Sequence, residues 1–248
     1  MELVTAGVVT LIGYLIGSIS FARVVGRFVG SEENLTEDTL LPSTDADRPM
    51  RLHAVSATTL GNRAGSRAGA TAGMLDVLKV LLPTLAVRFL TGDEPPYYLL
   101  AAIGGMVGHI WPIYYRFLGG RGVSAAFAGF VAVAPLGAFV TWLVGTFLGL
   151  LVIRDGMVTF IGWMWLMIPW LWFRTKDWRF ALFALVINVL FVVAMIPEIK
   201  VYAQYRREGI ALSFEEGLQT TPMGKGLYKI GVRLGALKET PLKDDHGT

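Results

Sequence analysis

Long apolar stretches with almost no charged residue alternate with short polar segments along this chain. Several of these stretches have almost no charge for about 15 to 20 residues, the length that a helix needs to cross the hydrocarbon core of a bilayer. A helix is the expected spanning form because it satisfies its backbone polar groups internally. The pattern predicts an all-α fold, a polytopic transmembrane helical bundle of about seven spans. The predicted segments are residues 3–28, 68–90, 97–117, 123–134, 136–153, 157–173 and 180–196.

Two prolines set the limits of this pattern. Pro135 leaves two alternatives: a turn between two spans, which gives seven, or a kink within one span, which gives six. Pro197 is expected to end the last span, because proline removes a helical hydrogen bond and clashes with the preceding turn. Residues 1–197 are therefore predicted to form one integral membrane domain, with a polar cytoplasmic loop at 29–67. Residues 198–248 are predicted to form a cytoplasmic C-terminal tail.

Composition excludes a water-soluble domain. Of the 248 residues, 54% are hydrophobic and 17% are charged, and the mean hydropathy is +0.55. Soluble domains carry roughly 25% charged residues. The sequence has no cysteine, and its three histidines are far apart, so it indicates no metal site. No cofactor is expected, and no pattern specifies an oligomeric state.

The placement of Lys and Arg predicts the orientation, because cytoplasmic loops of membrane proteins are enriched in both. The loop 29–67, the segment 116–121 and the tail contain basic residues, whereas the turn at 91–96 has none. With seven spans the N-terminus lies outside and the C-terminus in the cytoplasm. Three basic residues depart from the rule, because this arrangement places them outside: Arg174, Lys176 and Arg179. The net charge of +3 fits anionic lipid headgroups rather than nucleic acid.

A glycine-rich loop carries the strongest local signal for chemistry. Gly119, Gly120 and Gly122 surround Arg121 where a helix is predicted to begin. Glycines let backbone N–H groups turn toward an anion, a helix N-terminus favours negative charge, and a guanidinium binds phosphate with two hydrogen bonds. This pattern predicts a phosphate site. The alternative is a plain tight loop whose arginine reaches lipid headgroups.

A second cluster of hydroxyls, glycines and arginines occupies residues 55–67. It fits another anion site in which Arg63 and Arg67 are the cations, although an ordinary basic flank of a span gives the same composition. Within the next span, Asp76 and Lys79 are three residues apart and share a helix face. Charges inside a bilayer are costly unless they are paired or face a cavity, so this pair is either structural or catalytic.

Other residues within the predicted spans have ordinary packing interpretations. His109 is interpreted as a packed histidine, with a general base as the alternative. Asn188 is predicted to hydrogen-bond between helices, and the small residues of the first span to allow close helix packing.

Four motifs in matching order and spacing cover residues 10–135 and resemble one family. These are Gly17-Ser-Ile-Ser-Phe21, Asp76-Val-Leu-Lys79 with Pro83, Gly108-His-Ile-Trp-Pro112, and Gly119-Gly-Arg-Gly-Val123. The chain resembles the bacterial PlsY-type glycerol-3-phosphate acyltransferases, which use acyl phosphate as the acyl donor. Arg121 stands where that family usually has lysine. The resemblance implies that Gly119, Gly120, Arg121 and Gly122 bind phosphate.

The resemblance also implies an activity and further site residues. The expected reaction transfers a fatty acyl group from acyl phosphate to the sn-1 hydroxyl of glycerol 3-phosphate, giving lysophosphatidic acid at the bacterial plasma membrane. Ser56 and Arg63 are the implied catalytic residues, and Arg67 and Lys79 additional substrate-binding cations.

The sequence also departs from the family pattern in two places. The family's catalytic loop begins S-G-N, which is absent here, and Ser56 stands as its substitute. The family's H-x-x-N element corresponds to the stretch 197–206, which has neither His nor Asn. These departures leave open a non-catalytic homologue. Asp76 and Lys79 inside a span leave open a transporter of a phosphorylated solute, although the two halves show no inverted repeat. An acyltransferase for a different polyol phosphate is the third alternative.

Overall fold

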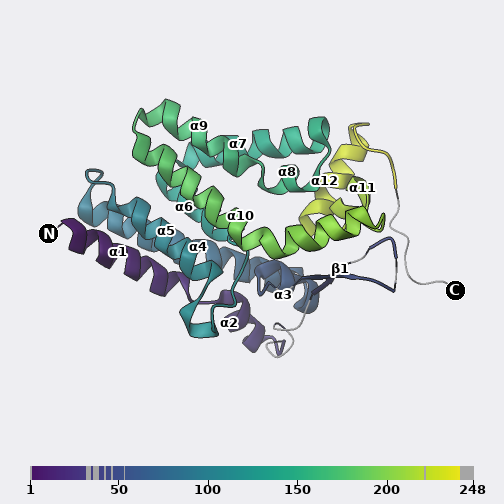
Figure 1. Ribbon diagram of the computed structural model, residues 1–248, viewed down its shortest axis with the longest axis horizontal. Coiled ribbons are helices and arrows are strands. Elements are labelled where there is room, and N and C mark those ends of the chain that lie inside the picture. Colours follow the sequence, from purple (N-terminus) through teal and green to yellow (C-terminus); the bar gives the residue numbers. More distant parts are fainter. Residues whose placement is uncertain are drawn as a thin grey trace.

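The computed structural model describes residues 2–31, 35, 39–41, 43–45, 47–52, 54–220 and 222–240. Parts of the predicted loop 29–67 and the last eight residues of the predicted tail, 241–248, lie outside the described residues. Long helices run side by side along the longest axis of the molecule (Figure 1).

Helices account for most of the described chain. The first half contains α1 (Glu2–Gly17), α2 (Phe21–Phe28), α3 (Ala57–Ala64), α4 (Ser66–Thr91), α5 (Tyr97–Ile110) and the 3-10 turn η2 (Ile113–Tyr115). The second half contains α6 (Val123–Val133), α7 (Pro135–Phe147), its π-helical continuation η3 (Leu148–Ile153), α8 (Gly156–Ile161), α9 (Trp163–Thr175), α10 (Trp178–Arg207), α11 (Phe214–Leu218) and α12 (Pro222–Arg233). Two short strands, β1 (Thr39–Leu41) and β2 (Met50–Leu52), pair antiparallel and depart from the predicted all-α class.

The predicted segment boundaries are partly confirmed. Helix α4 differs from its predicted range by two residues at the start and one at the end. Pro135 is the first residue of a separate helix, α7, and whether α6 and α7 are two spans stays a prediction. The third segment is shorter than predicted, because α5 ends at Ile110 just before Pro112. The prediction that Pro197 ends the last helix is wrong, since α10 continues through it to Arg207. Membrane helices accept an internal proline where neighbouring groups compensate for the lost hydrogen bond.

Among the residues that the structure describes, four helical segments are long and apolar enough to cross a membrane. They are Glu2–Phe28, Ser66–Thr91, Pro135–Ile153 and Trp178–Arg207. Helix α6 is apolar but shorter. Large apolar side chains remain on the surface, such as Leu3, 86% exposed, and Phe89, 90% exposed. A helical membrane bundle is thereby confirmed, whereas the count of seven spans stays a prediction.

Close packing of α1 against α5 depends on glycine, as the small residues of the first span predicted. A Cβ atom at Gly13 would overlap the backbone of Ala101, and one at Gly17 would overlap the backbone of Gly105. From the other side, a Cβ at Gly104 would overlap the backbone carbonyl of Thr10. Without side chains in between, the two backbones gain van der Waals contact that lipid cannot replace.

The apolar core lies between α5, α6, α9 and α10. Phe130 of α6 meets Trp163 and Phe183 edge-to-face, at centroid distances of 5.8 and 5.7 Å. The Asn188 amide of α10 donates to the Met164 carbonyl of α9 at 3.0 Å, which confirms the predicted interhelical bond.

The connections gather at two opposite ends of the bundle. At the short-turn end, residues 92–96 and 175–178 adjoin, because Arg179 forms an ion pair with Glu94 at 2.7 Å. This end lies at the left of Figure 1, beside the N-terminus of α1. At the other end, which we call the glycine-loop end, residues 112–122 and 198–208 adjoin the described residues 47–52 and 54–56.

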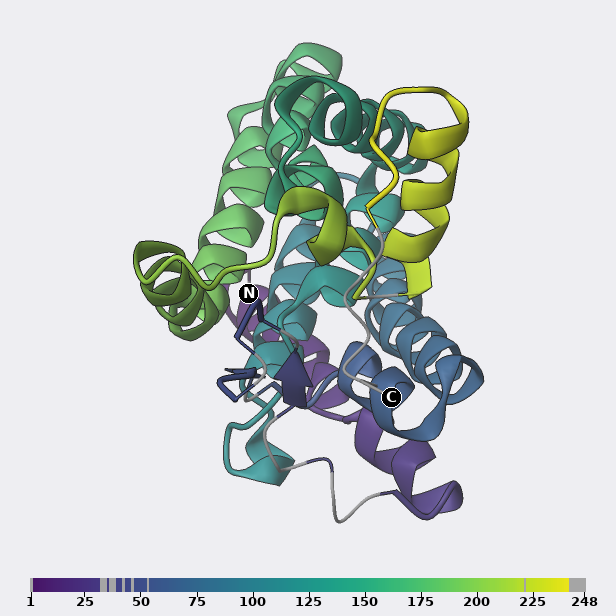
Figure 2. The same cartoon turned by 90° about the vertical axis from the view of Figure 1, so that its right-hand side faces the viewer.

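The first part of the predicted tail is folded onto the bundle. Leu218 of α11 and Leu237, which follows α12, are buried against Leu150 of η3. Figure 2 shows α12 upright beside the end of α7. Glycine at 231 fits this packing, because a Cβ there would come within 2.5 Å of Leu237.

Candidate functional site

The glycine loop, residues 119–122, is attached to two other segments through its backbone. The Gly120 N–H donates to the His109 carbonyl at 3.1 Å, which fixes the loop to the end of α5. The Val55 N–H donates to the Gly119 carbonyl at 3.1 Å, which joins the loop to the segment before α3. The two stretches that the sequence singled out for anion binding are therefore adjacent.

The loop requires glycine for steric reasons. A Cβ at Gly120 would overlap the imidazole of His109, and one at Gly119 would overlap the carbonyls of His109 and Ile110. Gly122 has φ of +95°, a conformation that side chains disfavour, and immediately precedes α6. The loop thus packs against α5 and leads directly into a helix N-terminus, a position that favours anions.

Arg121 at the centre of the loop is held by a carboxylate from another helix. Its Nε donates to Glu198 Oε1 of α10 at 2.6 Å. The two side chains are 18% and 16% exposed, so solvent screens this pair only in part. The sequence analysis did not single out Glu198. Its one sequence signal is that it is a carboxylate within residues 197–206, the stretch that lacks the family's His and Asn.

Ser56, the predicted catalytic hydroxyl, lies at the N-cap of α3. Its Oγ accepts a hydrogen bond from the Thr59 N–H at 3.3 Å and lies 3.2 Å from Thr59 Oγ1. The Thr59 hydroxyl in turn donates to the Ala54 carbonyl at 2.6 Å. Serine at an N-cap satisfies an amide that the helix leaves unpaired, so Ser56 fixes the start of α3 beside the glycine loop.

The other two predicted cations follow Ser56 along the chain. Arg63 lies half-buried in the last turn of α3, and Arg67 lies exposed in the first turn of α4. The two helices pack closely where Gly61 faces Gly69, since a Cβ at Gly69 would come within 2.6 Å of the Gly61 Cα.

Lys79 is engaged by protein groups inside the bundle. Its Nζ lies 2.7 Å from Asp76 Oδ1 and donates to the Ile19 carbonyl at 2.5 Å. Ile19 belongs to the break between α1 and α2, where a carbonyl has no helical partner. These contacts stabilise the break in the first span, and the prediction that Lys79 binds substrate stays a prediction.

His109 connects this ion pair with the glycine loop. The ring is buried, its Nδ1 lies 3.7 Å from Asp76 Oδ1, and its other side packs against Gly120. The separation from Asp76 is too long for a hydrogen bond. The packed interpretation of His109 agrees with this position.

Arg23 of α2 is a buried cation close to the glycine loop. Its guanidinium carbon lies 4.5 Å from the ring centroid of Tyr115, which belongs to η2. An arginine over an aromatic face is stabilised by the ring quadrupole. The contact ties α2 to the segment 112–118 next to the glycine loop.

Residues 43–45 and 47–52 lie against the C-terminal end of α10 and the residues that follow it. Arg48 forms an ion pair with Glu208 at 2.7 Å, and the Tyr205 hydroxyl donates to the Pro49 carbonyl at 3.1 Å. A hydrogen bond from Gln204, followed by the one from Arg48, holds the pKa of Glu208 below its usual range. The polar loop is thereby fastened to the helix that supplies Glu198.

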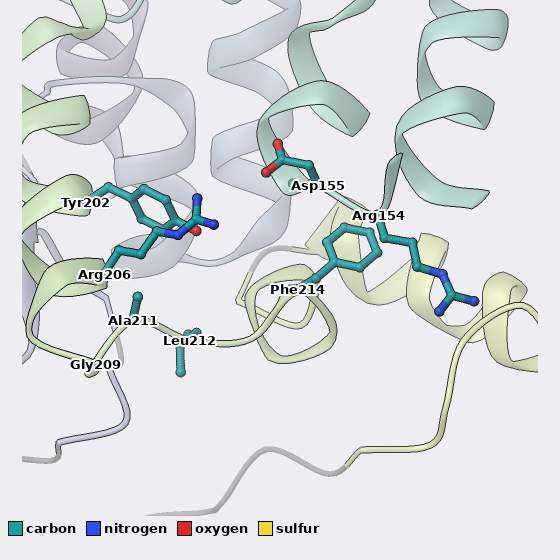
Figure 3. A pocket seen from close by; sticks show the side chains of 9 residues that line it. Arg154, Asp155, Tyr202, Arg206, Gly209, Ala211, Leu212 and Phe214 are labelled. Atoms are coloured by element: carbon teal, nitrogen blue, oxygen red, sulfur yellow. The ribbon is translucent and has the colours of Figure 1, made fainter. Parts of the chain in front are cut away.

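A cavity of about 330 Å³ opens further along α10. Figure 3 shows Tyr202, Arg206 and Asp155 facing it, whereas Arg154 points away. Arg154 donates to the Ala236 carbonyl at 2.6 Å. None of the predicted site residues lines this cavity, so we do not assign it to the anion site.

Comparison with known proteins agrees with this geometry. The model of the family described as glycerol-3-phosphate acyltransferase matches residues 45–204. Two relatives carry the same description: one from Pectobacterium carotovorum subsp. carotovorum (strain PC1) is 38% identical over 146 residues, and one from Albidiferax ferrireducens is 32% identical over 142 residues. These matches cover 58% and 54% of this chain, and 61% and 57% of the relatives' own lengths.

Solved structures share the fold. A crystal structure of PlsY (YgiH), an integral membrane glycerol 3-phosphate acyltransferase, has a TM-score of 0.67 in its glycerol 3-phosphate form and 0.65 in its lysophosphatidic acid form. Identity to these two chains is 22% and 21%, and each match covers 84% of this chain and 94% of the other. The family match takes in the glycine loop, the segment before α3 and the Glu198 turn of α10. The chain therefore belongs to the glycerol-3-phosphate acyltransferase family, as the resemblance predicted.

Proposed function

We propose that this chain transfers a fatty acyl group from acyl phosphate to the sn-1 hydroxyl of glycerol 3-phosphate, giving lysophosphatidic acid. The observation that carries the proposal is the attachment of the glycine loop beside the segment 54–63, with Arg121 at its centre. Both relatives are described as glycerol-3-phosphate acyltransferases, and one solved relative is in a glycerol 3-phosphate form.

The reaction joins the hydroxyl oxygen of glycerol 3-phosphate to the acyl carbonyl carbon and breaks the bond from that carbon to the phosphate oxygen. Inorganic phosphate leaves, and a substrate phosphate takes the hydroxyl proton. Because phosphate is a good leaving group, the protein mainly has to position two anions and stabilise the oxygen on which charge develops.

We assign the glycerol 3-phosphate anion to the glycine loop. The Gly120 N–H already donates to the His109 carbonyl, so the other N–H groups of the loop and the Arg121 guanidinium supply the donors to one phosphate. The N-terminus of α6 adds a favourable dipole. Ser56, Arg63 and Arg67 form the second cluster, which we assign to the acyl phosphate. Lys79 is buried beside Asp76 and the Ile19 carbonyl, and we propose it as a further cation whose charge favours the bound phosphates.

The glycine-loop end is proposed to face the cytoplasm of the bacterial plasma membrane, with seven spans and the N-terminus outside. Basic residues of the polar loop, the segment 116–121 and the tail gather there, as cytoplasmic surfaces do. Of the three basic residues that depart from the rule, Arg179 is paired with Glu94 and Asp177 at the opposite end.

The absence of cysteine from the sequence makes the orientation testable by single-cysteine labelling. We expect Asp93→Cys to react in intact cells with a reagent that does not cross the membrane, and Lys238→Cys to react only after lysis. The opposite result would reverse the proposed orientation.

The activity is tested with purified protein in detergent, by measuring phosphate release from a long-chain acyl phosphate with and without glycerol 3-phosphate. Release that requires glycerol 3-phosphate and is lost in Arg121→Ala supports the proposal. Folded wild-type protein that releases no phosphate would refute it in favour of a non-catalytic homologue or a transporter. Release with another polyol phosphate alone would change the assigned acceptor.

A further inference from the structure

We infer that Glu198 is a positioning residue that orients Arg121 so that its two Nη groups face a phosphate. This inference rests on the proposed function of the glycine loop. It concerns a carboxylate that reaches the loop from α10, a helix remote from the loop in sequence.

The atoms that form the contact support this role. The hydrogen bond from Arg121 to Glu198 uses Nε, which lies at the side of the guanidinium plane. In the part of the chain that the structure describes, no hydrogen bond from either Nη group of Arg121 is present. A guanidinium presents five N–H donors in a fixed planar fork, so a partner at Nε sets the direction of the remaining donors.

The surroundings of Arg121 restrict the orientation of its guanidinium. The glycine loop is fixed through Gly119 and Gly120, so the Cα of Arg121 cannot shift freely. The ion pair is mostly buried, and partial exclusion of water strengthens charge-assisted hydrogen bonds. Because the Arg121 side chain is held at both its Cα and its Nε, it loses little further conformational entropy when phosphate binds.

The same geometry explains why this position carries arginine. A lysine ammonium is a single point of charge at the end of four methylenes, with no second edge that a carboxylate can hold while the first edge binds an anion. A lysine here would be drawn to Glu198 itself. Arg121 and Glu198 therefore act as a matched pair, in which the carboxylate orients the cation rather than neutralising it.

The opposite model is that Glu198 occupies Arg121 in the empty protein and competes with phosphate. The two models predict opposite effects of removing the carboxylate. If Glu198 orients Arg121, its loss weakens phosphate binding. If Glu198 competes, its loss strengthens phosphate binding, and so does neutralisation to glutamine.

The experiment compares Glu198→Ala and Glu198→Gln with wild type, using kcat and KM for glycerol 3-phosphate and KM for acyl phosphate. Calorimetric binding of inorganic phosphate provides a readout that does not need turnover. Glu94→Ala is the matched control, since it removes another arginine–glutamate pair at the short-turn end. Thermal unfolding of each variant checks that it is folded.

We expect Glu198→Ala to raise KM for glycerol 3-phosphate on the order of tenfold, which corresponds to about 1.4 kcal/mol. KM for acyl phosphate should not change. Glu198→Gln should stay close to wild type, because its amide oxygen still accepts the Nε–H. Glu94→Ala should leave every constant unchanged. Arg121→Lys should raise the same KM, and adding Glu198→Ala to it should raise it no further.

Two results would overturn the inference: an unchanged KM and phosphate affinity in folded Glu198→Ala, or tighter phosphate binding in both Glu198 variants. Failure of the proposed function appears separately, as wild-type protein that does not release phosphate in response to glycerol 3-phosphate. In that case the calorimetric binding of inorganic phosphate tests the positioning role of Glu198. Weaker binding in the alanine variant with recovery in the glutamine variant supports the positioning role, and no binding by wild type refutes it.

Discussion

Replacing Asp76 with leucine tests how the break in the first span is stabilised. In the native protein the Asp76 and Lys79 side chains are each only 3% exposed, and Lys79 also holds the Ile19 carbonyl. Asp76→Leu leaves a buried ammonium with a carbonyl as its remaining described partner. Removal of one member of a buried ion pair costs about 3–5 kcal/mol, because the other charge stays buried without compensation.

Removing both charges should cost less than removing either one. Lys79→Met alone leaves the Asp76 carboxylate unpaired and the Ile19 carbonyl without its donor. The double variant Asp76→Leu/Lys79→Met has no buried charge and leaves only that carbonyl unsatisfied, at a cost of about 1–3 kcal/mol. We therefore expect the stability order wild type, then the double variant, then the single variants.

The assay is equilibrium unfolding in mixed detergent micelles, with tryptophan fluorescence as the readout. It is applied to the wild type, the two single variants and the double variant. Glu94→Leu is the control for losing a carboxylate from an exposed ion pair. Glu94 is 69% exposed, and exposed ion pairs contribute about 0–1 kcal/mol. The reasoning is refuted if the losses of the two single variants add in the double variant, because independent sites add and coupled sites do not.

Two further predictions concern packing and pH. Gly17→Leu should lower the free energy of unfolding by about 1–3 kcal/mol or more, because its Cβ would overlap the backbone of α5. Gly7 has open space around it, so Gly7→Leu should be neutral in the same assay. The pKa of Glu208 is depressed by Gln204 and Arg48, so its contribution to stability is complete above the ordinary glutamate pKa and is lost as pH falls through the folded-state pKa. Residues 43–45 and 47–52 should lose protection over that fall in pH, measured as hydrogen exchange relative to the intrinsic rate at each pH. Glu208→Gln should remove this pH-dependent loss of protection.

The sequence predicted the features that depend on local pattern. Apolar length and terminal polar residues located α4 to within two residues, and the run of glycines in the first span predicted its close contact with another helix. Glycines around a single arginine predicted the loop that Val55 and His109 hold in place. Each of these signals lies within a few neighbouring residues.

Features that depend on partners far along the chain could not be derived in this way. The break at Ile19 receives its hydrogen bond from Lys79, sixty residues later, and Arg121 meets a carboxylate of α10, seventy-seven residues later. Helix α10 continues through Pro197, where an isolated helix would be disfavoured. It does so because tertiary packing outweighs local helix propensity. A short apolar pattern also could not separate α8 from α9 at Gly162.

The hydrogen bond between the Val55 amide and the Gly119 carbonyl affects which substitutions this part of the sequence can accept during evolution. A main-chain N–H belongs to every residue except proline, so the junction between the two segments does not depend on the identity of a side chain. Val55 itself is buried, and other apolar residues of similar size could replace it. Neighbouring positions are thus free to lose a family motif while the segment stays in register with the loop, and proline at 55 is the substitution that would disconnect them.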